Sequence, residues 1–223
     1  MRALPLRMSL SIDRLRNRLR PGVHQRSHVT GWHRYPVLFR EVRRVAEQER
    51  LERPHILSFG CSSGEECASL SEQFPGARVV GTDISPRMRA RAQRIADENP
   101  AVVIVPSRDD LVAAFGPYDI VFALSVLCRH QETRHVDNCA RVYPFERFET
   151  AAARLANWVA PGGLLVLYNT TFRFQDTLAS EDFVDVTPPA IAASGTIAQF
   201  DREHRRLDQP DRACIFRKRE THG

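Results

Sequence analysis

The chain alternates short apolar runs with longer amphipathic stretches from Pro36 onward. Pro36 opens a predicted helix, because proline suits the first helical turn. The apolar stripe of this helix consists of Val37, Leu38, Val42, Val45 and Ala46. Further helices are predicted at 65–74, 86–97 and 145–159, and buried strands at 56–59, 78–81, 102–105, 118–124 and 164–168. Strands that alternate with helices predict an α/β fold whose parallel sheet is covered on both faces.

Proline and glycine mark the ends of these elements. Pro75-Gly76 stops the helix at 65–74, and Pro161-Gly162-Gly163 closes the helix at 145–159 before the fifth strand. The tail adds two strand-like pieces at 196–200 and 213–217. The sequence shows no internal repeat and no low-complexity tract.

Residues 1–30 lack a clean hydrophobic period and contain Pro21-Gly22, so we expect an extension before a single domain at 31–223. The first 50 residues hold twelve arginines against four acidic residues. Three interpretations stay open: a solvated arm, a nucleic-acid contact and a targeting peptide. Because Lys218 is the only lysine, arginine is the default surface cation, which favours the solvated arm.

Composition narrows the class of protein. The 223 residues are 43% apolar and 26% charged, a balance that suits one globular domain with a sizeable core. No apolar run approaches the ~18 residues of a membrane span, and no signal-like cleavage site follows the start. Five cysteines, odd in number and irregularly spaced, argue against a disulfide framework and indicate a cytoplasmic protein.

The sharpest local feature is Gly60-Cys61-Ser62-Ser63-Gly64, which lies between a predicted strand and a predicted helix. Glycines permit a tight turn, and a helix start presents unpaired N–H groups to a ligand. Asp83 ends the next strand, 23 residues after Gly60, where a doubly wound sheet places a carboxylate beside the loop to accept ribose hydroxyls. A bland alternative is a plain turn, with Asp83 capping the helix near Pro86.

Other ligands and reactions fit this loop less well. A dinucleotide prefers glycine where Ser62 stands, and a phosphate-binding P-loop needs a Gly-Lys-Ser/Thr ending. The loop also matches the G-x-S-x-G nucleophile elbow, with Ser62 as nucleophile and a late histidine such as His204. That elbow normally follows several earlier strands, whereas this loop ends the first strand.

Four motifs in order resemble class I S-adenosylmethionine-dependent methyltransferases. Residues 56–66 resemble motif I, 81–85 motif II, 118–127 motif IV, and 160–166 the late Pro-Gly-Gly motif. The Gly-Cys-Ser-x-Gly-Glu-Glu form is most similar to the chemotaxis receptor glutamate methyltransferases, without their accessory domains. The resemblance implies a doubly wound, Rossmann-like, seven-stranded mixed sheet in the order 3-2-1-4-5-7-6, with the last strand antiparallel.

The resemblance also implies which residues hold S-adenosylmethionine. Gly60 and Gly64 should approach the ligand by backbone, Asp83 should take the ribose, and Ile84 should pack on the adenine. Asp109 matches an adenine contact or a helix N-cap, and Glu65 is expected to replace the acid missing at Ser58. The implied cofactor set is Gly60, Cys61, Ser62, Gly64, Glu65, Asp83, Ile84, Asp109, Leu124 and Ser125.

Methyl transfer is an in-line displacement, so a sequence need not announce a catalytic residue. The long polar segment at 128–144 holds His130, the histidine nearest the predicted methyl donor and our candidate base or orienting group. Asn169, after the fifth strand, is a candidate substrate contact. The segment at 32–35 is a candidate lid. We expect no metal, because the cysteines and histidines at 128–139 do not match a compact zinc site.

The sequence therefore predicts an S-adenosylmethionine-dependent methyltransferase that acts on a small molecule. An alternative acceptor is RNA or protein, approached through the arginine-rich N-terminus. Two further alternatives are a non-catalytic S-adenosylmethionine-binding regulator and a serine hydrolase that uses Ser62. We expect no membrane partner. The sequence does not indicate which oligomeric state the protein adopts.

Overall fold

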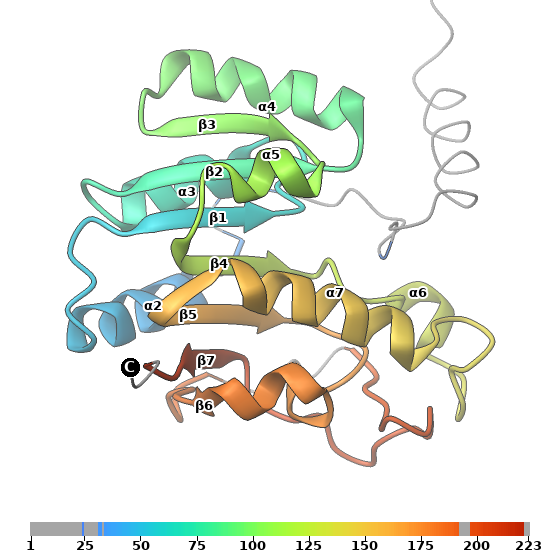
Figure 1. Cartoon of the computed structure of the whole chain (residues 1–223). Coiled ribbons are helices and arrows are strands. Elements are labelled where there is room, and N and C mark those ends of the chain that lie inside the picture. Colours follow the sequence, from blue (N-terminus) through green and yellow to red (C-terminus); the bar gives the residue numbers. More distant parts are fainter. Residues whose placement is uncertain (1–23, 25–30, 33, 192–196, 221–223) are drawn as a thin grey trace, which may run out of the picture.

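A computed structural model describes residue 24 and residues 31–32, 34–191 and 197–220 (Figure 1). The predicted extension at 1–30 lies outside the described residues, except for His24. The elements in chain order are α2 (Pro36–Gln48), β1 (His55–Phe59), α3 (Glu65–Gln73), β2 (Arg78–Asp83), α4 (Pro86–Glu98), β3 (Val102–Pro106), α5 (Asp109–Ala113), β4 (Tyr118–Leu124), α6 (His130–Thr133), α7 (Phe145–Trp158), β5 (Val159–Tyr168), the 3-10 turns η1 (Phe174–Asp176) and η2 (Leu178–Asp182), β6 (Phe183–Asp185) and β7 (Ile215–Lys218).

The strands form one seven-stranded sheet in the order β3-β2-β1-β4-β5-β7-β6, which confirms the expected fold. β1 pairs in parallel with β2 and β4, and the parallel run extends to β3 and β5. β7 is antiparallel to both β5 and β6. No helix in the described part of the chain is long and apolar enough to cross a membrane.

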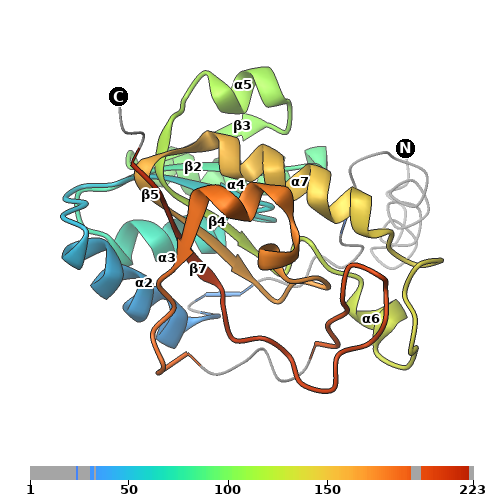
Figure 2. The ribbon, with the colours of Figure 1, turned by 60° about the horizontal axis from the view of Figure 1, so that its bottom comes forward.

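Helices cover both faces of the sheet. Ile56 packs in a buried cluster with α2, α3 and α4, whereas its neighbour Leu57 packs in a second cluster with α5 and α7. Successive side chains of a strand point to opposite faces, so a central strand that is buried on both faces is mostly apolar. Figures 1 and 2 show α3 and α7 on opposite sides of the strands. The carboxyl ends of the parallel strands meet at one edge, where the loop at 60–64 lies.

The start of the fifth strand differs from the sequence prediction. Pro161-Gly162-Gly163 lies inside β5, because the pairing with β4 shifts register between Tyr118 and Ile120 and the irregularity accommodates the motif. A side chain at Gly163 would lie 2.8 Å from the carbonyl oxygen of Asp119, so this close approach of two strands requires glycine.

The strand predicted at 196–200 is wrong. Residue 196 lies outside the described residues, and Phe200 makes only isolated bridges to Phe172 and Arg206. The sixth strand is instead β6, a short edge strand whose three residues carry no recognisable period. The sequence also did not predict the short helices α5 and α6.

Candidate functional site

The loop between β1 and α3 is held tightly against its neighbours. The backbone N–H groups of Gly60 and Cys61 both donate to the carbonyl of Thr82 in β2, at 2.8 and 2.9 Å. Gly60 and Gly64 have positive φ values of 83° and 98°. A Cβ atom at Gly60 would lie 2.5 Å from Cγ2 of Val126, which belongs to the loop that follows β4. The glycines are therefore required by both backbone conformation and close packing.

Asp83 joins this loop to the start of α4. Its Oδ2 accepts from the backbone N–H of Ser62 at 3.0 Å, and its Oδ1 accepts from the N–H of Ser85 at 2.8 Å. The helix cap is instead Ser85, whose Oγ accepts from the N–H of Met88. Each carboxylate oxygen keeps lone-pair capacity beyond these bonds, so Asp83 can still accept from ligand hydroxyls.

The acid that faces the loop is Glu66. Ser58 Oγ, at the end of β1, donates to Oε1 of Glu66 at 2.7 Å. Burial raises the pKa of Glu66 to about 7, opposed by the Ser58 hydrogen bond and the charge of Arg34. Glu65, which the sequence assigned to this role, instead accepts from the hydroxyl of Ser63. Adjacent helical residues point about 100° apart, so the one-residue difference decides which acid reaches Ser58.

A pocket of about 360 Å³, including its open mouth, lies over this loop. Among the predicted cofactor residues, Gly60, Cys61, Ser62 and Leu124 line it. The remaining lining residues, which the sequence did not assign to the cofactor, are Gly31, Arg34, Tyr35, Phe39, Glu66 and Ser69. The sequence contained one indication of these residues, which was their position. Arg34 and Tyr35 belong to the segment at 32–35, the candidate lid.

Three polar side chains meet beside the pocket. The hydroxyl of Tyr35 lies 2.8 Å from Oγ of Ser125, and Nδ2 of Asn169 donates to the same Oγ at 3.0 Å. Ser125 follows β4 and Asn169 follows β5, so neighbouring strand ends supply both. Burial raises the pKa of the Tyr35 phenol, although hydrogen bonds from Ser125 and Asn169 partly offset this effect. The sequence-predicted Ser125 and Asn169 are thus brought together.

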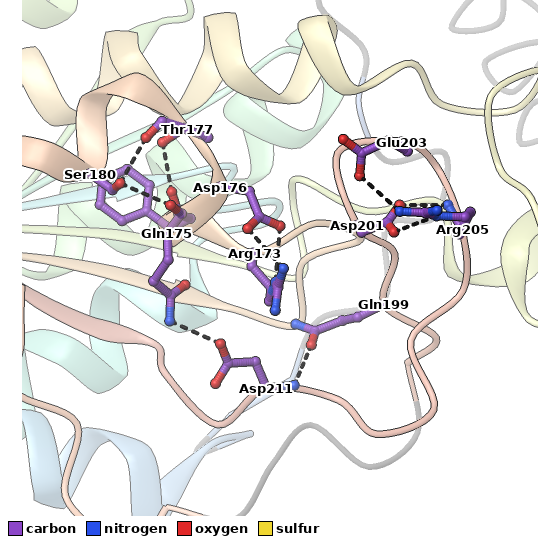
Figure 3. A network of polar contacts seen from close by, with 11 residues as sticks. Arg173, Gln175, Asp176, Thr177, Ser180, Gln199, Asp201, Glu203, Arg205 and Asp211 are labelled. Atoms are coloured by element: carbon purple, nitrogen blue, oxygen red, sulfur yellow. Dashed lines mark hydrogen bonds and ion pairs between the residues drawn. The ribbon is translucent and has the colours of Figure 1, made fainter.

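The chain beyond Asn169 is fixed by a polar network (Figure 3). The guanidinium of Arg173 donates to both carboxylate oxygens of Asp176, each at 2.9 Å. Asp211 accepts from Gln175 at 2.9 Å, and its backbone N–H donates to Oε1 of Gln199 at 2.6 Å. Such paired bonds give fixed geometry. They hold the segment that carries Asn169 against the C-terminal segment.

The structure does not bring every predicted residue to the pocket lining. Asp109 is exposed, and its Oδ1 accepts from Arg154 of α7 at 3.2 Å. Ile84 is half-buried beside Asp83. His130 begins α6, and its Nδ1 is buried without a hydrogen-bond partner among the described residues. None of the three lines the pocket. The same holds for the other predicted site residues Gly64, Glu65, Asp83, Ser125 and Asn169, and the roles of all eight stay predictions.

The geometry gives no support to hydrolase or metal chemistry. Oγ of Ser62 is buried without a hydrogen-bond partner among the described residues. Nε2 of His204 accepts from the backbone N–H of Phe145 at 2.9 Å, so it is engaged at the start of α7. Across the described ranges, no cluster of three metal-ligating side chains occurs. All five cysteines are free and buried.

Comparisons with solved structures return methyltransferases. CalS10, an amino pentose methyltransferase from Micromonospora echinaspora, is 19% identical with a TM-score of 0.43, over 76% of this chain and 58% of that one. DesVI of Streptomyces venezuelae is 17% identical with a TM-score of 0.43, over 61% and 50%. The bifunctional kinase-methyltransferase WbdD is 21% identical with a TM-score of 0.46, over 67% and 31%. The chain thus spans less than two thirds of each of these proteins.

No curated protein matches the chain significantly. Residues 57–165 match the family model described as a methyltransferase domain. The matched segment holds the loop at 60–64, Asp83 and the whole of β4, and so includes the pocket-lining residues Gly60, Cys61, Ser62 and Leu124. The chain is therefore similar to a methyltransferase domain over 109 of its 223 residues, just under half of its length.

Proposed function

We propose that this protein transfers a methyl group from S-adenosylmethionine to a small molecule bound at the carboxyl edge of the sheet. The observation that carries the proposal is the bond between Ser62 N–H and Asp83, which fixes the loop and the acid in one arrangement. Gly60 leaves no room for a side chain there, so the backbone itself forms the floor of the pocket. Ser62 Oγ adds a buried polar atom that a ligand would satisfy.

The pocket suits a zwitterionic amino-acid group beside a nucleoside. Glu66 and Arg34 both line it. The Glu66 carboxylate can pair with the ammonium of the ligand, and the Arg34 guanidinium can pair with its carboxylate. Asp83, at the end of β2, is positioned for two adjacent ribose hydroxyls. Phe39 and Leu124 supply apolar walls that exclude water. We therefore assign Gly60, Cys61, Ser62, Asp83 and Glu66 to cofactor binding.

When bound, S-adenosylmethionine supplies an electrophilic methyl carbon on a sulfonium sulfur. The chain's own residues then have three tasks: they hold the donor, align the acceptor and keep water away. Tyr35, Ser125 and Asn169 are placed to align the acceptor, because they adjoin the pocket wall at Leu124. His130 stays a candidate base.

A small acceptor is favoured over RNA or protein by the charges on α2. Arg43 pairs with Glu47 at 2.8 Å, and Arg44 pairs with Glu41 at 3.1 Å. Neutralised arginines offer less to a phosphate backbone than unpaired ones. Methylation of RNA or protein is the alternative, and it predicts labelled macromolecules from the assay described below. The chemotaxis-receptor likeness, the cytoplasmic location and a nucleic-acid contact through the arginine-rich N-terminus stay predictions.

Calorimetry with S-adenosylhomocysteine tests the cofactor assignment. Asp83→Ala and the isosteric Asp83→Asn should each weaken binding at least tenfold, because they remove acceptor oxygens for the ribose and for Ser62. Asp97→Ala, an exposed aspartate of α4, is the matched control and should bind like wild type. No binding by wild type at millimolar ligand would contradict the proposal. Binding without turnover on any acceptor would instead favour a regulatory protein.

A further inference from the structure

The amide of Asn169 has a defined orientation. Its Nδ2 donates to Oγ of Ser125 at 3.0 Å, and the same amide lies within hydrogen-bonding reach of the Tyr35 phenol. With the nitrogen so engaged, the remaining polar atom of the amide is Oδ1, an acceptor with two lone pairs. Among the residues that the structure describes, none donates to it. The amide therefore presents an acceptor oxygen beside the pocket.

The backbone adopts the same strained conformation at Ser125 and Asn169, directly after the neighbouring strands β4 and β5. Ser125 and Asn169 both have φ values of 57°, in the left-handed region. Asparagine tolerates this conformation and serine less so. Strained residues of this kind gather where a side chain must be aimed at a ligand. Ser62, with φ of 52°, repeats the pattern in the cofactor loop.

Two phenols and one thiol around Ser125 and Asn169 hold their protons, whereas Glu66, in the same pocket, is assigned to the ammonium of the cofactor. Burial raises the pKa of Tyr35 and of Tyr168. Burial also raises the pKa of Cys128 to about 11, and its Sγ donates to the carbonyl of Ser125 at 3.5 Å. An amide oxygen does not accept a proton near neutral pH. These groups can orient an acceptor molecule, but they cannot take a proton from an alcohol.

We propose that the methyl acceptor is a neutral primary or secondary amine whose N–H donates to Oδ1 of Asn169. This inference rests on the proposed function and names its substrate class. A neutral amine carries its own lone pair, so it needs orientation and no base. Tyr35 and Ser125 are positioning residues, because they fix the amide rather than touch the acceptor.

The bonds balance without any further reactant. The lone pair of the amine nitrogen forms the new N–C bond while the C–S bond breaks, and that bond's electron pair stays on sulfur. The nitrogen becomes an ammonium and loses its proton to water. An alcohol would need a base to become a comparable nucleophile, which the three side chains do not provide.

Sinefungin tests the role of Asn169 without a known substrate, because it carries an amine where S-adenosylmethionine carries its methyl group. Calorimetry should show that wild type binds sinefungin at least about tenfold more tightly than S-adenosylhomocysteine, given a charge-assisted hydrogen bond. Asn169→Gly, which suits the positive φ, should abolish this preference and leave S-adenosylhomocysteine binding unchanged. Asn169→Asp keeps an acceptor oxygen and should retain it. An equal preference in wild type and Asn169→Gly would overturn the inference.

A second measurement identifies the accepting atom. The enzyme is incubated with a small-molecule extract and S-adenosylmethionine labelled with deuterium in its methyl group, and labelled products are analysed by mass spectrometry and NMR. The methyl group should be found on nitrogen. Transfer to oxygen, sulfur or carbon overturns the amine assignment while supporting the proposed function. No labelled product at all counts against the proposed function, and this inference fails with it.

Discussion

Oγ of Ser58 donates a 2.7 Å hydrogen bond to Oε1 of Glu66, and this bond ties the end of β1 to the first turn of α3. The strand position that many class I methyltransferases give to an acid is here a serine, and the acid comes from the helix instead. Burial raises the pKa of Glu66 to about 7, so the carboxyl group titrates near neutral pH.

Glu66 should make stability depend on pH. Its folded-state pKa lies above its usual value of 4.5, so its contribution is fully present below pH 4.5 and is lost as pH rises through about 7. We expect the free energy of unfolding of wild type, relative to Glu66→Gln, to fall by on the order of 2 kcal/mol across this window. Urea denaturation at pH 4.5 and pH 8 measures the difference. A constant offset between the two proteins would show that folding does not raise the pKa of Glu66.

Ligand binding should expel the proton of Glu66. If the ammonium of the ligand's amino-acid group lies against this carboxylate, it favours the charged form. We therefore expect S-adenosylhomocysteine binding at pH 6.5 to release part of a proton. Calorimetry in buffers of different ionisation enthalpy measures this release, and Glu66→Gln should abolish it. Equal release from the Gln variant would assign the proton to another group.

Gly60→Ala should damage the cofactor loop. The substitution meets a φ of 83° and a predicted contact of 2.5 Å with Val126, so we expect a loss of about 2–4 kcal/mol. Thermal unfolding and S-adenosylhomocysteine titration measure both effects. Gly31→Ala is the matched control, because nothing lies within 4 Å of its Cβ position although Gly31 lines the same pocket. Adding Val126→Ala to Gly60→Ala should restore only that part of the lost stability which is due to crowding against Val126.

His24 should make the protein sensitive to acid. Burial, followed by the charges of Arg147, Arg154 and Arg129, lowers its pKa from 6.5 to about 3. Its stabilising contribution is therefore present above pH 6.5 and lost as pH falls through this range toward 3. His24→Gln should flatten the pH dependence of unfolding by a few kcal/mol. Tyr143→Phe, which removes only the hydroxyl that contacts His24, should keep the slope. Parallel slopes for wild type and the Gln variant would refute the assignment.

His204 should act in stability and not in catalysis. Its Nε2 accepts from the N–H of Phe145 at the start of α7, where Pro144 supplies no side-chain cap. We expect His204→Ala to cost about 1–2 kcal/mol in unfolding free energy and to leave S-adenosylhomocysteine affinity unchanged. His135→Ala, at an exposed histidine, should be nearly silent. Labelling of Ser62 by a fluorophosphonate that depends on His204 would revive the hydrolase alternative.

The sequence by itself determined the central part of the fold. The strands β1 to β4 and the second half of β5 fall where the apolar runs predict them, because central parallel strands are buried on both faces and tolerate few polar residues. The loop at 60–64 and Asp83 could also be paired from the sequence, since strand ends in such a sheet meet at one edge. The sequence missed β6, because a three-residue edge strand has too few buried positions to show a period.

The tertiary structure decided which side chains face the pocket. The choice of Glu66 over Glu65 depends on the rotation of α3 about its axis, which Ser58 on another element fixes. Tyr35 reaches Ser125 across 90 residues of sequence, and Asn169 reaches the same oxygen across 44. Such contacts have no local signal. Periodicity records only how each segment meets the core, whereas a site is made where the ends of separate segments converge.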